Sequence, residues 1–124
     1  MRALSIAVVG VLWVSTFPVV AAAQESPEAA LAQIREQALH ANYREALTSV
    51  RAYLARDDLD ASERNAGLET LATIHIALRQ EGEAREVLAQ LYGRDPGHVL
   101  SDPDASPPVL SAFGRARGNP PDPV

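Results

Sequence analysis

The chain has 124 residues, of which 47% are hydrophobic, 5% aromatic and 22% charged, and its formal charge is −5. This length suits one small domain. All eleven basic residues are arginines and cysteine is absent, which excludes Schiff bases, P-loop lysines, thiol catalysis, disulfides and thiolate metal sites. A negative chain with scattered arginines is also a poor partner for nucleic acid or for an anionic membrane surface.

Residues 1–23 have the pattern of a secretory signal peptide. The positive charge of Arg2 is followed by an uncharged apolar stretch, which ends in Pro18 and the small residues Ala21-Ala22-Ala23. This pattern predicts export and cleavage after Ala23. The stretch approaches the ~20 residues that span a bilayer, but Pro18 and the alanines disfavour the alternative of an uncleaved anchor. We therefore expect a periplasmic or secreted protein without membrane insertion after cleavage.

Residues 27–54 predict two helices joined by a short turn. Ser26 is placed to cap the first helix, and Pro27 occupies its first position. Ala41-Asn42 interrupts the helical pattern, and a second helix begins at Tyr43. The apolar positions of the two helices are Leu31, Ile34, Ala38 and Leu39, then Tyr43, Ala46, Leu47, Val50, Tyr53 and Leu54.

A second pair of helices follows the polar connection at residues 57–60. Asp60 and Glu63 have the spacing of a capping box at the start of the third helix. That helix is expected to end near residues 80–82, and the fourth at residues 95–97. Their apolar positions are Leu68, Leu71, Ala72, His75 and Leu78, then Ala84, Val87, Leu88 and Leu91. Since no segment alternates long enough to form a strand, the predicted fold is all-α.

Residues 98–117 are predicted to be a linker and a capping helix. Prolines and aspartates dominate the beginning of this stretch, and Ser106-Pro107 restarts a helix that should cover the open end of the stack. The apolar stripe of this helix is Leu110, Phe113 and Ala116. Residues 118–124 are rich in proline and are expected to be a disordered tail.

The helical region 24–97 resembles tetratricopeptide repeats (TPRs), units of about 34 residues with two antiparallel helices. The positions that carry the resemblance are Leu68, Leu71, Ala72, His75, Ala84, Leu88, Leu91 and Asp95-Pro96. The small residues would let paired helices approach closely, while the leucines fill the space between them. The resemblance implies helix-turn-helix pairs stacked as a short solenoid, of the kind found in exported bacterial repeat proteins.

Several positions depart from the repeat pattern. His75 stands where an aromatic is usual, and Gly82 is displaced from the usual turn site. The first pair of helices fits less well, and the distance from Ala46 to Ala84 is 38 residues. The loop at 57–60 must absorb the excess over the standard period. A generic bundle of four or five helices is the alternative interpretation.

The histidines, acids and serines suggest no catalytic, metal or cofactor site. His40, His75 and His98 lack the three- or four-residue spacing of a chelating pair. We expect His75 in the core and the other two histidines facing solvent. The acidic stretch from Asp57 lacks the glycine of a calcium loop, and no G-x-S-x-G surrounds a serine. The protein is not expected to be an enzyme, and a small hydrolase is only a remote alternative.

A protein-interaction module is the function that these observations favour. In TPRs the first helix of each pair lines a concave face, so the resemblance implies a surface for a basic or apolar peptide. That surface would contain Ala29, Ala32, Glu36, Glu69, Thr73 and Ile76. A merely solvated helix face is the structural alternative.

A structural subunit of a homo-oligomer or an envelope complex is the second hypothesis. It follows because two repeats fall short of the three or so that such arrays need for stability. The side chains that discriminate between the hypotheses are Leu110 and Phe113, which either fold back onto the stack or face outward.

Overall fold

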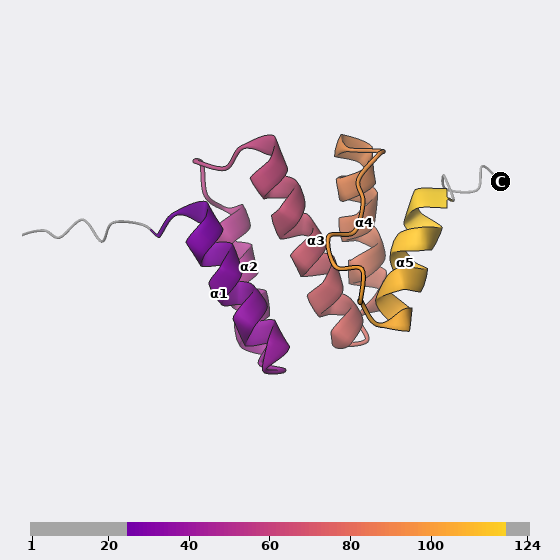
Figure 1. The fold of residues 1–124 in the computed structure, drawn as a ribbon, viewed down its shortest axis with the longest axis horizontal. Coiled ribbons are helices and arrows are strands. Elements are labelled where there is room, and N and C mark those ends of the chain that lie inside the picture. The colour runs from indigo at the N-terminus through magenta and orange to yellow at the C-terminus, as the bar shows by residue number, and fades with distance from the viewer. Residues whose placement is uncertain (1–24, 119–124) are drawn as a thin grey trace, which may run out of the picture.

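The computed structural model describes residues 25–118, and this part of the chain forms five helices and no strand (Figure 1). The helices are α1 (Pro27–Leu39), α2 (Tyr43–Leu54), α3 (Ala61–Ala77), α4 (Glu81–Arg94) and α5 (Pro107–Gly118). The prediction of an all-α fold is confirmed for these residues. The predicted signal peptide, residues 1–23, and residues 119–124 of the predicted tail lie outside the described residues. Gly118, which we assigned to the tail, is instead the last residue of α5.

Two of the helices begin at the caps that the sequence predicts. The Ala29 amide donates to Ser26 Oγ at 3.2 Å, directly before Pro27. At the start of α3, the Glu63 amide donates to Asp60 Oδ1 at 2.7 Å, and the Asp60 amide donates to Glu63 Oε1 at 3.0 Å. This is the complete capping box, and it satisfies backbone donors that a helix start leaves unpaired.

The turn between α1 and α2 closes with a left-handed residue. Ala41 has a φ of 61°, and its amide donates to the Ala38 carbonyl at 3.0 Å. The next amide, that of Asn42, donates to the Gln37 carbonyl at 2.9 Å. These two hydrogen bonds define a Schellman motif, which ends α1 and reverses the chain into α2.

The turn between α3 and α4 has the same geometry. Arg79 has a φ of 58°, its amide donates to the Ile76 carbonyl at 3.0 Å, and the Gln80 amide donates to the His75 carbonyl at 2.8 Å. Each of these residues lies 38 positions after its counterpart in the first turn. Gly82 is not needed in this turn because Arg79 adopts the left-handed conformation that a glycine would otherwise supply.

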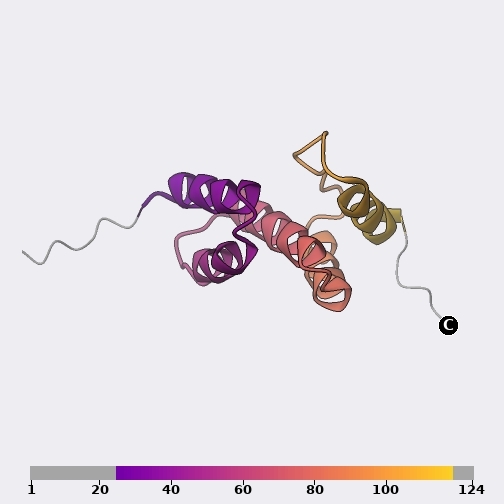
Figure 2. The same ribbon diagram turned by 90° about the horizontal axis from the view of Figure 1, so that it is seen from below.

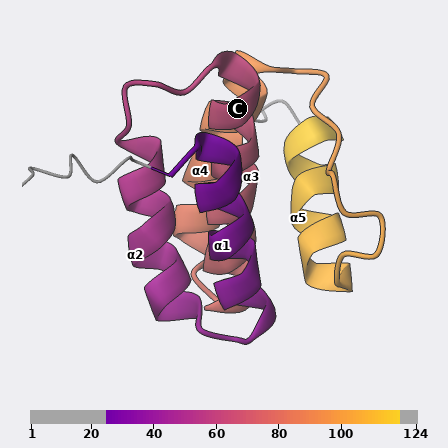
Figure 3. The same cartoon turned by 60° about the vertical axis from the view of Figure 1, so that its left-hand side comes forward.

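The helices pack as a row in chain order, with α1 and α2 at one end and α5 at the other (Figures 1 and 3). α3 packs against both helices of the first hairpin, and α5 packs in turn against α4 and α3. The core that joins them contains Leu31, Ile34, Ala46, Val50, Tyr53, Leu68, Leu71, Ala72, Ile74, Val87, Leu88, Leu91, Val109 and Phe113.

The junction between the hairpins depends on a close approach at Gly67. A Cβ atom at this position would lie 2.6 Å from Tyr53 Cε1 and 2.8 Å from Leu54 Cδ2. The Tyr53 ring is held by its hydroxyl, which donates to the Glu63 carbonyl at 3.0 Å, and burial is the main cause that raises the pKa of this phenol. Glycine is therefore the residue that lets α3 contact α2 here.

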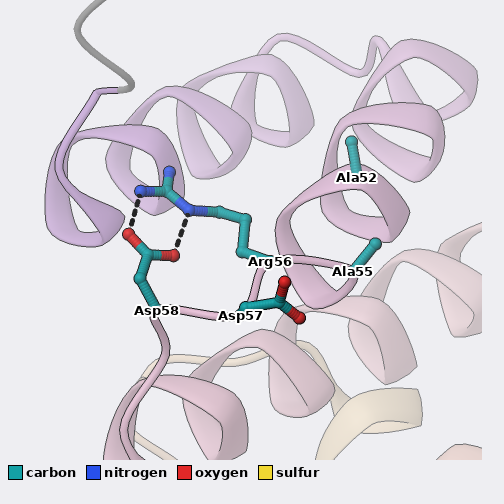
Figure 4. A pocket seen from close by; sticks show the side chains of 5 residues that line it. All are labelled: Ala52, Ala55, Arg56, Asp57 and Asp58. Carbon is teal, nitrogen blue, oxygen red and sulfur yellow. Dashed lines mark hydrogen bonds and ion pairs between the residues drawn. The ribbon is translucent and has the colours of Figure 1, made fainter.

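The connection from α2 to α3 is organised by arginines (Figure 4). The Arg56 guanidinium makes two hydrogen bonds to the Asp58 carboxylate, at 2.8 and 2.7 Å, which lower the pKa of Asp58 and raise that of Arg56. Arg64 of α3 donates to the Leu54 carbonyl at 3.1 Å. The shallow depression in Figure 4, lined in addition by Ala52, Ala55 and Asp57, is the surface of this ordered connection.

Candidate functional site

A groove of about 410 Å³ runs over α3 between α1 and the segment that follows α4. α3 forms its floor, and Figure 2 shows α1 on one side and the irregular segment on the other, with α2 and α4 on the opposite face of the molecule. The lining residues are Arg35 from α1, Ser62, Asn65, Ala66 and Glu69 from α3, and Asp95, His98, Val99 and Ser101 from the segment.

The wall and the upper floor of the groove carry polar groups without partners in the described chain. Arg35 follows the buried Ile34 in α1, so its exposed side chain lies beside the core-facing stripe. Its guanidinium forms no ion pair among residues 25–118. The Oδ1 atom of Asn65 is buried and likewise has no hydrogen-bond partner among them. The groove therefore offers a cation and an unused acceptor to a bound segment.

Glu69 lies at the centre of the floor, and its side chain is 7% exposed. Its Oε2 lies 2.6 Å from Nε2 of His98. Its Oε1 accepts from both the backbone amide of Ser101, at 3.2 Å, and the hydroxyl of the same residue, at 2.5 Å. A buried carboxylate needs such donors to offset its lost hydration, so these contacts fix the segment to α3.

His98 is held on three sides. Besides Glu69, its Nδ1 lies 3.6 Å from Asp95 Oδ2, and the Tyr92 ring stands edge-on to it with centroids 6.2 Å apart. Its side chain is 13% exposed, so the prediction that His98 faces solvent is wrong. The turn at residues 95–98 directs the chain back over α3, which the local sequence does not reveal.

The other two histidines lie where the sequence predicts. His75 is buried in α3, and its Nδ1 lies 2.7 Å from Gln80 Oε1. His40 is exposed at the end of α1, where its Nε2 lies 3.0 Å from Glu36 Oε1. Both predictions are confirmed, because helical periodicity alone separates these positions.

The six residues predicted to form a partner-binding face do not form one open surface. On α1, Ala29, Ala32 and Glu36 are exposed; on α3, Thr73 and Ile76 are half-buried and Glu69 is buried. The Thr73 hydroxyl donates to the Glu69 carbonyl at 2.9 Å. The expectation that Glu69 offers its charge to a partner is corrected, because both of its carboxylate oxygens are occupied by the chain itself.

Sequence analysis missed most of the groove. Arg35, Asn65, Asp95 and Ser101 were not identified, and His98 was assigned to solvent. One signal could have found part of it: Glu69 shares a helix face with apolar residues, so it needs donors, and a histidine and a serine follow within the next connection. No spacing rule links residues 29 and 32 positions apart, however.

The groove contains no recognisable catalytic or metal-binding arrangement within residues 25–118. No cluster of three or more potential metal ligands occurs in this part of the chain. The Ser101 hydroxyl and His98 both contact Glu69, and no hydrogen bond joins them to each other. What the geometry provides is recognition chemistry: donors, acceptors and a fixed charge on a helical floor.

In comparisons with known proteins, no protein-family model, no curated protein and no solved structure matches this chain. Among the described residues, no helix has both the length and the apolar character needed to cross a membrane.

Proposed function

We propose that this chain is an exported protein-interaction module, built as a short TPR-like solenoid without catalytic activity. The observation that carries the proposal is the repeated hairpin, in which α1–α2 and α3–α4 share one turn geometry at a spacing of 38 residues. Stacked helical hairpins create an extended surface of first helices. In this chain α1 and α3 contribute such a surface to the groove.

α5 acts as the cap of this solenoid in our proposal. It packs against α4 and α3 much as α3 packs against α2 and α1, so it takes the place that the first helix of another hairpin would occupy. Val109 and Phe113 anchor it in the core. The register differs from the predicted one, because Val109 is buried whereas Leu110 is 47% exposed.

The groove suits an extended segment of a partner protein or peptide. Its free charges are Arg35 on one wall and Asp95 on the other, and Val99 adds an exposed apolar side chain. A segment that brings a carboxylate to Arg35 and a backbone amide to Asn65 would satisfy both unused groups. This ligand replaces the basic or apolar peptide expected when Glu69 was assigned to the surface.

Site-specific photocrosslinking tests the groove. A photoreactive amino acid is placed at Arg35 or Ser62, which line the groove, and at the exposed control positions Thr48 of α2 and Arg85 of α4. In the native host, one heterologous adduct should form from the groove positions and not from the controls. Equal adducts from all four positions, or none from the groove, would contradict the proposal.

Export is tested separately on the protein recovered from its host. Cleavage after Ala23 predicts a mature chain that begins at Gln24, which intact-mass measurement of the exported fraction reads directly. Full-length protein retained in the cytoplasm would exclude this part of the proposal without affecting the groove.

The alternative function is that of a structural subunit of a homo-oligomer. It is favoured by Leu110, which projects from α5 at the end of the row with 47% of its surface exposed. If α5 mediates self-association, Leu110→Ser should convert an oligomer into a monomer in sedimentation velocity. A wild-type protein that is already monomeric would exclude this alternative.

A further inference from the structure

The connection between α4 and α5 is bound to the fold mainly through polar contacts. Residues 95–106 contain no helix or strand, and their segment 98–101 supplies every hydrogen bond that the Glu69 side chain makes in the described chain. Val99, in the middle of this segment, is 66% exposed. The segment is thus an extended strap laid across a helix rather than part of the packed core.

The way that Glu69 holds the strap is that of a receptor holding a peptide. One carboxylate oxygen contacts the His98 side chain, and the other accepts from both the side chain and the backbone amide of Ser101. The carboxylate itself stands on α3, the helix packed against both α1–α2 and α4–α5. A rigid acceptor that reads two side chains and a backbone group recognises an extended polypeptide.

The strap also lies at the groove that we assign to a partner. His98, Val99 and Ser101 line that groove together with Arg35 and Asn65. A partner segment that reaches Arg35 therefore meets the strap, and the receptor on α3 is accessible to it only when the strap leaves.

We infer that the strap is a built-in ligand: residues 98–101 occupy, in cis, a peptide site centred on Glu69, and a partner segment of the same chemistry displaces them. Such a segment carries an imidazole or another cationic donor and, three residues later, a serine or threonine with a free backbone amide. This inference rests on the proposed function and adds the chemistry of the partner and an autoinhibitory contact.

The strap competes as a tethered ligand. A short tether gives an effective concentration in the millimolar range, so a free peptide that makes only the same contacts should bind the wild-type protein poorly. Removing the strap's own side chains should open the site, whereas removing the Glu69 charge should abolish recognition in either state.

The test uses the full chain and a synthetic peptide, DPGHVLSDPD, which copies residues 95–104. Amide resonances of residues 66–73 are followed by NMR up to millimolar peptide. The variant His98→Ala/Ser101→Ala should show saturable shifts at these amides, and the wild type should show shifts at least tenfold weaker at equal peptide concentration. Adding Glu69→Gln to the open variant should remove the shifts.

Two controls keep the result interpretable. A peptide with alanine in place of its histidine and serine should leave the open variant unchanged. If the double variant loses its dispersed spectrum, Ser101→Ala alone serves as the open form, since it retains the His98 contact. An open, folded variant that ignores the peptide overturns the inference.

The outcome is separable from that of the proposed function. Groove-specific crosslinks from Arg35 without peptide binding would leave the adaptor standing and exclude the strap as its built-in ligand. Peptide binding without groove-specific crosslinks would show a receptor on α3 but remove the partner that we propose for it.

Discussion

The two hairpins share a turn, a spacing and a direction, yet they differ in how their first helices are covered. α1 packs against α2 and α3, and its buried residues are Leu31 and Ile34. α3 packs against α1, α2, α4 and α5, and a continuous stretch from Gly67 to Ala72 is buried. The same helical unit thus has one core face at the end of the row and several in its middle.

Equivalent polar positions show what this difference does. Gln37 and His75 lie 38 residues apart and precede the same turn. His75 contacts Gln80 in the second hairpin, whereas Gln37 Oε1 is buried without a hydrogen-bond partner in the described chain. The central hairpin therefore satisfies its buried polar groups better than the terminal one, which is consistent with its greater coverage.

The largest expected effect comes from breaking the central hairpin. Leu91 is fully buried in α4, so Leu91→Ala should lower the free energy of unfolding by about 2–5 kcal/mol. Leu39 is 78% exposed at the end of α1, and Leu39→Ala is the matched control with an expected change within about 0.5 kcal/mol. Urea unfolding followed by circular dichroism measures both, and equal losses would contradict the assigned core.

The junction between the hairpins should be the next most sensitive place. In Gly67→Ala the new methyl group meets the Tyr53 ring, and we expect a loss of about 1–3 kcal/mol from overpacking. The control Gly93→Ala adds a methyl group in open space on α4 and should be neutral or stabilising by about 0.5–1 kcal/mol. Thermal unfolding distinguishes them, and a stabilised Gly67 variant would show that α2 and α3 do not approach so closely.

Removing the capping box should weaken the entry to α3 alone. Asp60→Ala deletes the acceptor for the Glu63 amide, and the expected loss is about 0.5–2 kcal/mol. Ser62→Ala, an exposed change in the same turn, serves as the control. Hydrogen exchange should show faster opening at residues 61–65 in the Asp60 variant, and uniform acceleration along the chain would contradict a local effect.

The smallest effect tests whether the two turns are equivalent. Ala41→Gly and Arg79→Gly each relieve the cost of a left-handed non-glycine residue, which is about 1–2 kcal/mol, against the added chain entropy of glycine. Each variant should therefore gain about 0.5 kcal/mol or slightly more. Ala89→Gly, an exposed change inside α4, should instead lose about 0.5–1 kcal/mol. Unequal signs at Ala41 and Arg79 would break the equivalence of the hairpins.

Local signals predicted the helices well because their causes lie within a few residues. The caps at Ser26 and Asp60 and the break at residues 41–42 depend on hydrogen bonds between near neighbours. The register of α5 could not be decided in this way, since Val109 and Leu110 both have helical spacing to Phe113. Which of them faces inward depends on where α4 and α3 lie.

The candidate site was harder to predict because its contacts join distant parts of the chain. Glu69 was placed correctly on the same helix as Thr73 and Ile76, but the strap that covers it returns from a connection about thirty residues later. The groove wall at Arg35 depends on α1 lying beside α3, which two separate helical patterns do not specify.

The repeated packing of α3 and α5 has a consequence for how the length of such a chain can change. Since α5 meets α4 and α3 in the way that α3 meets α2 and α1, an additional hairpin inserted between α4 and α5 would find a surface already suited to receive it. The molecule can grow by whole units along its row while both ends keep their present contacts, so its size is set by gene duplication rather than by redesign of a single core.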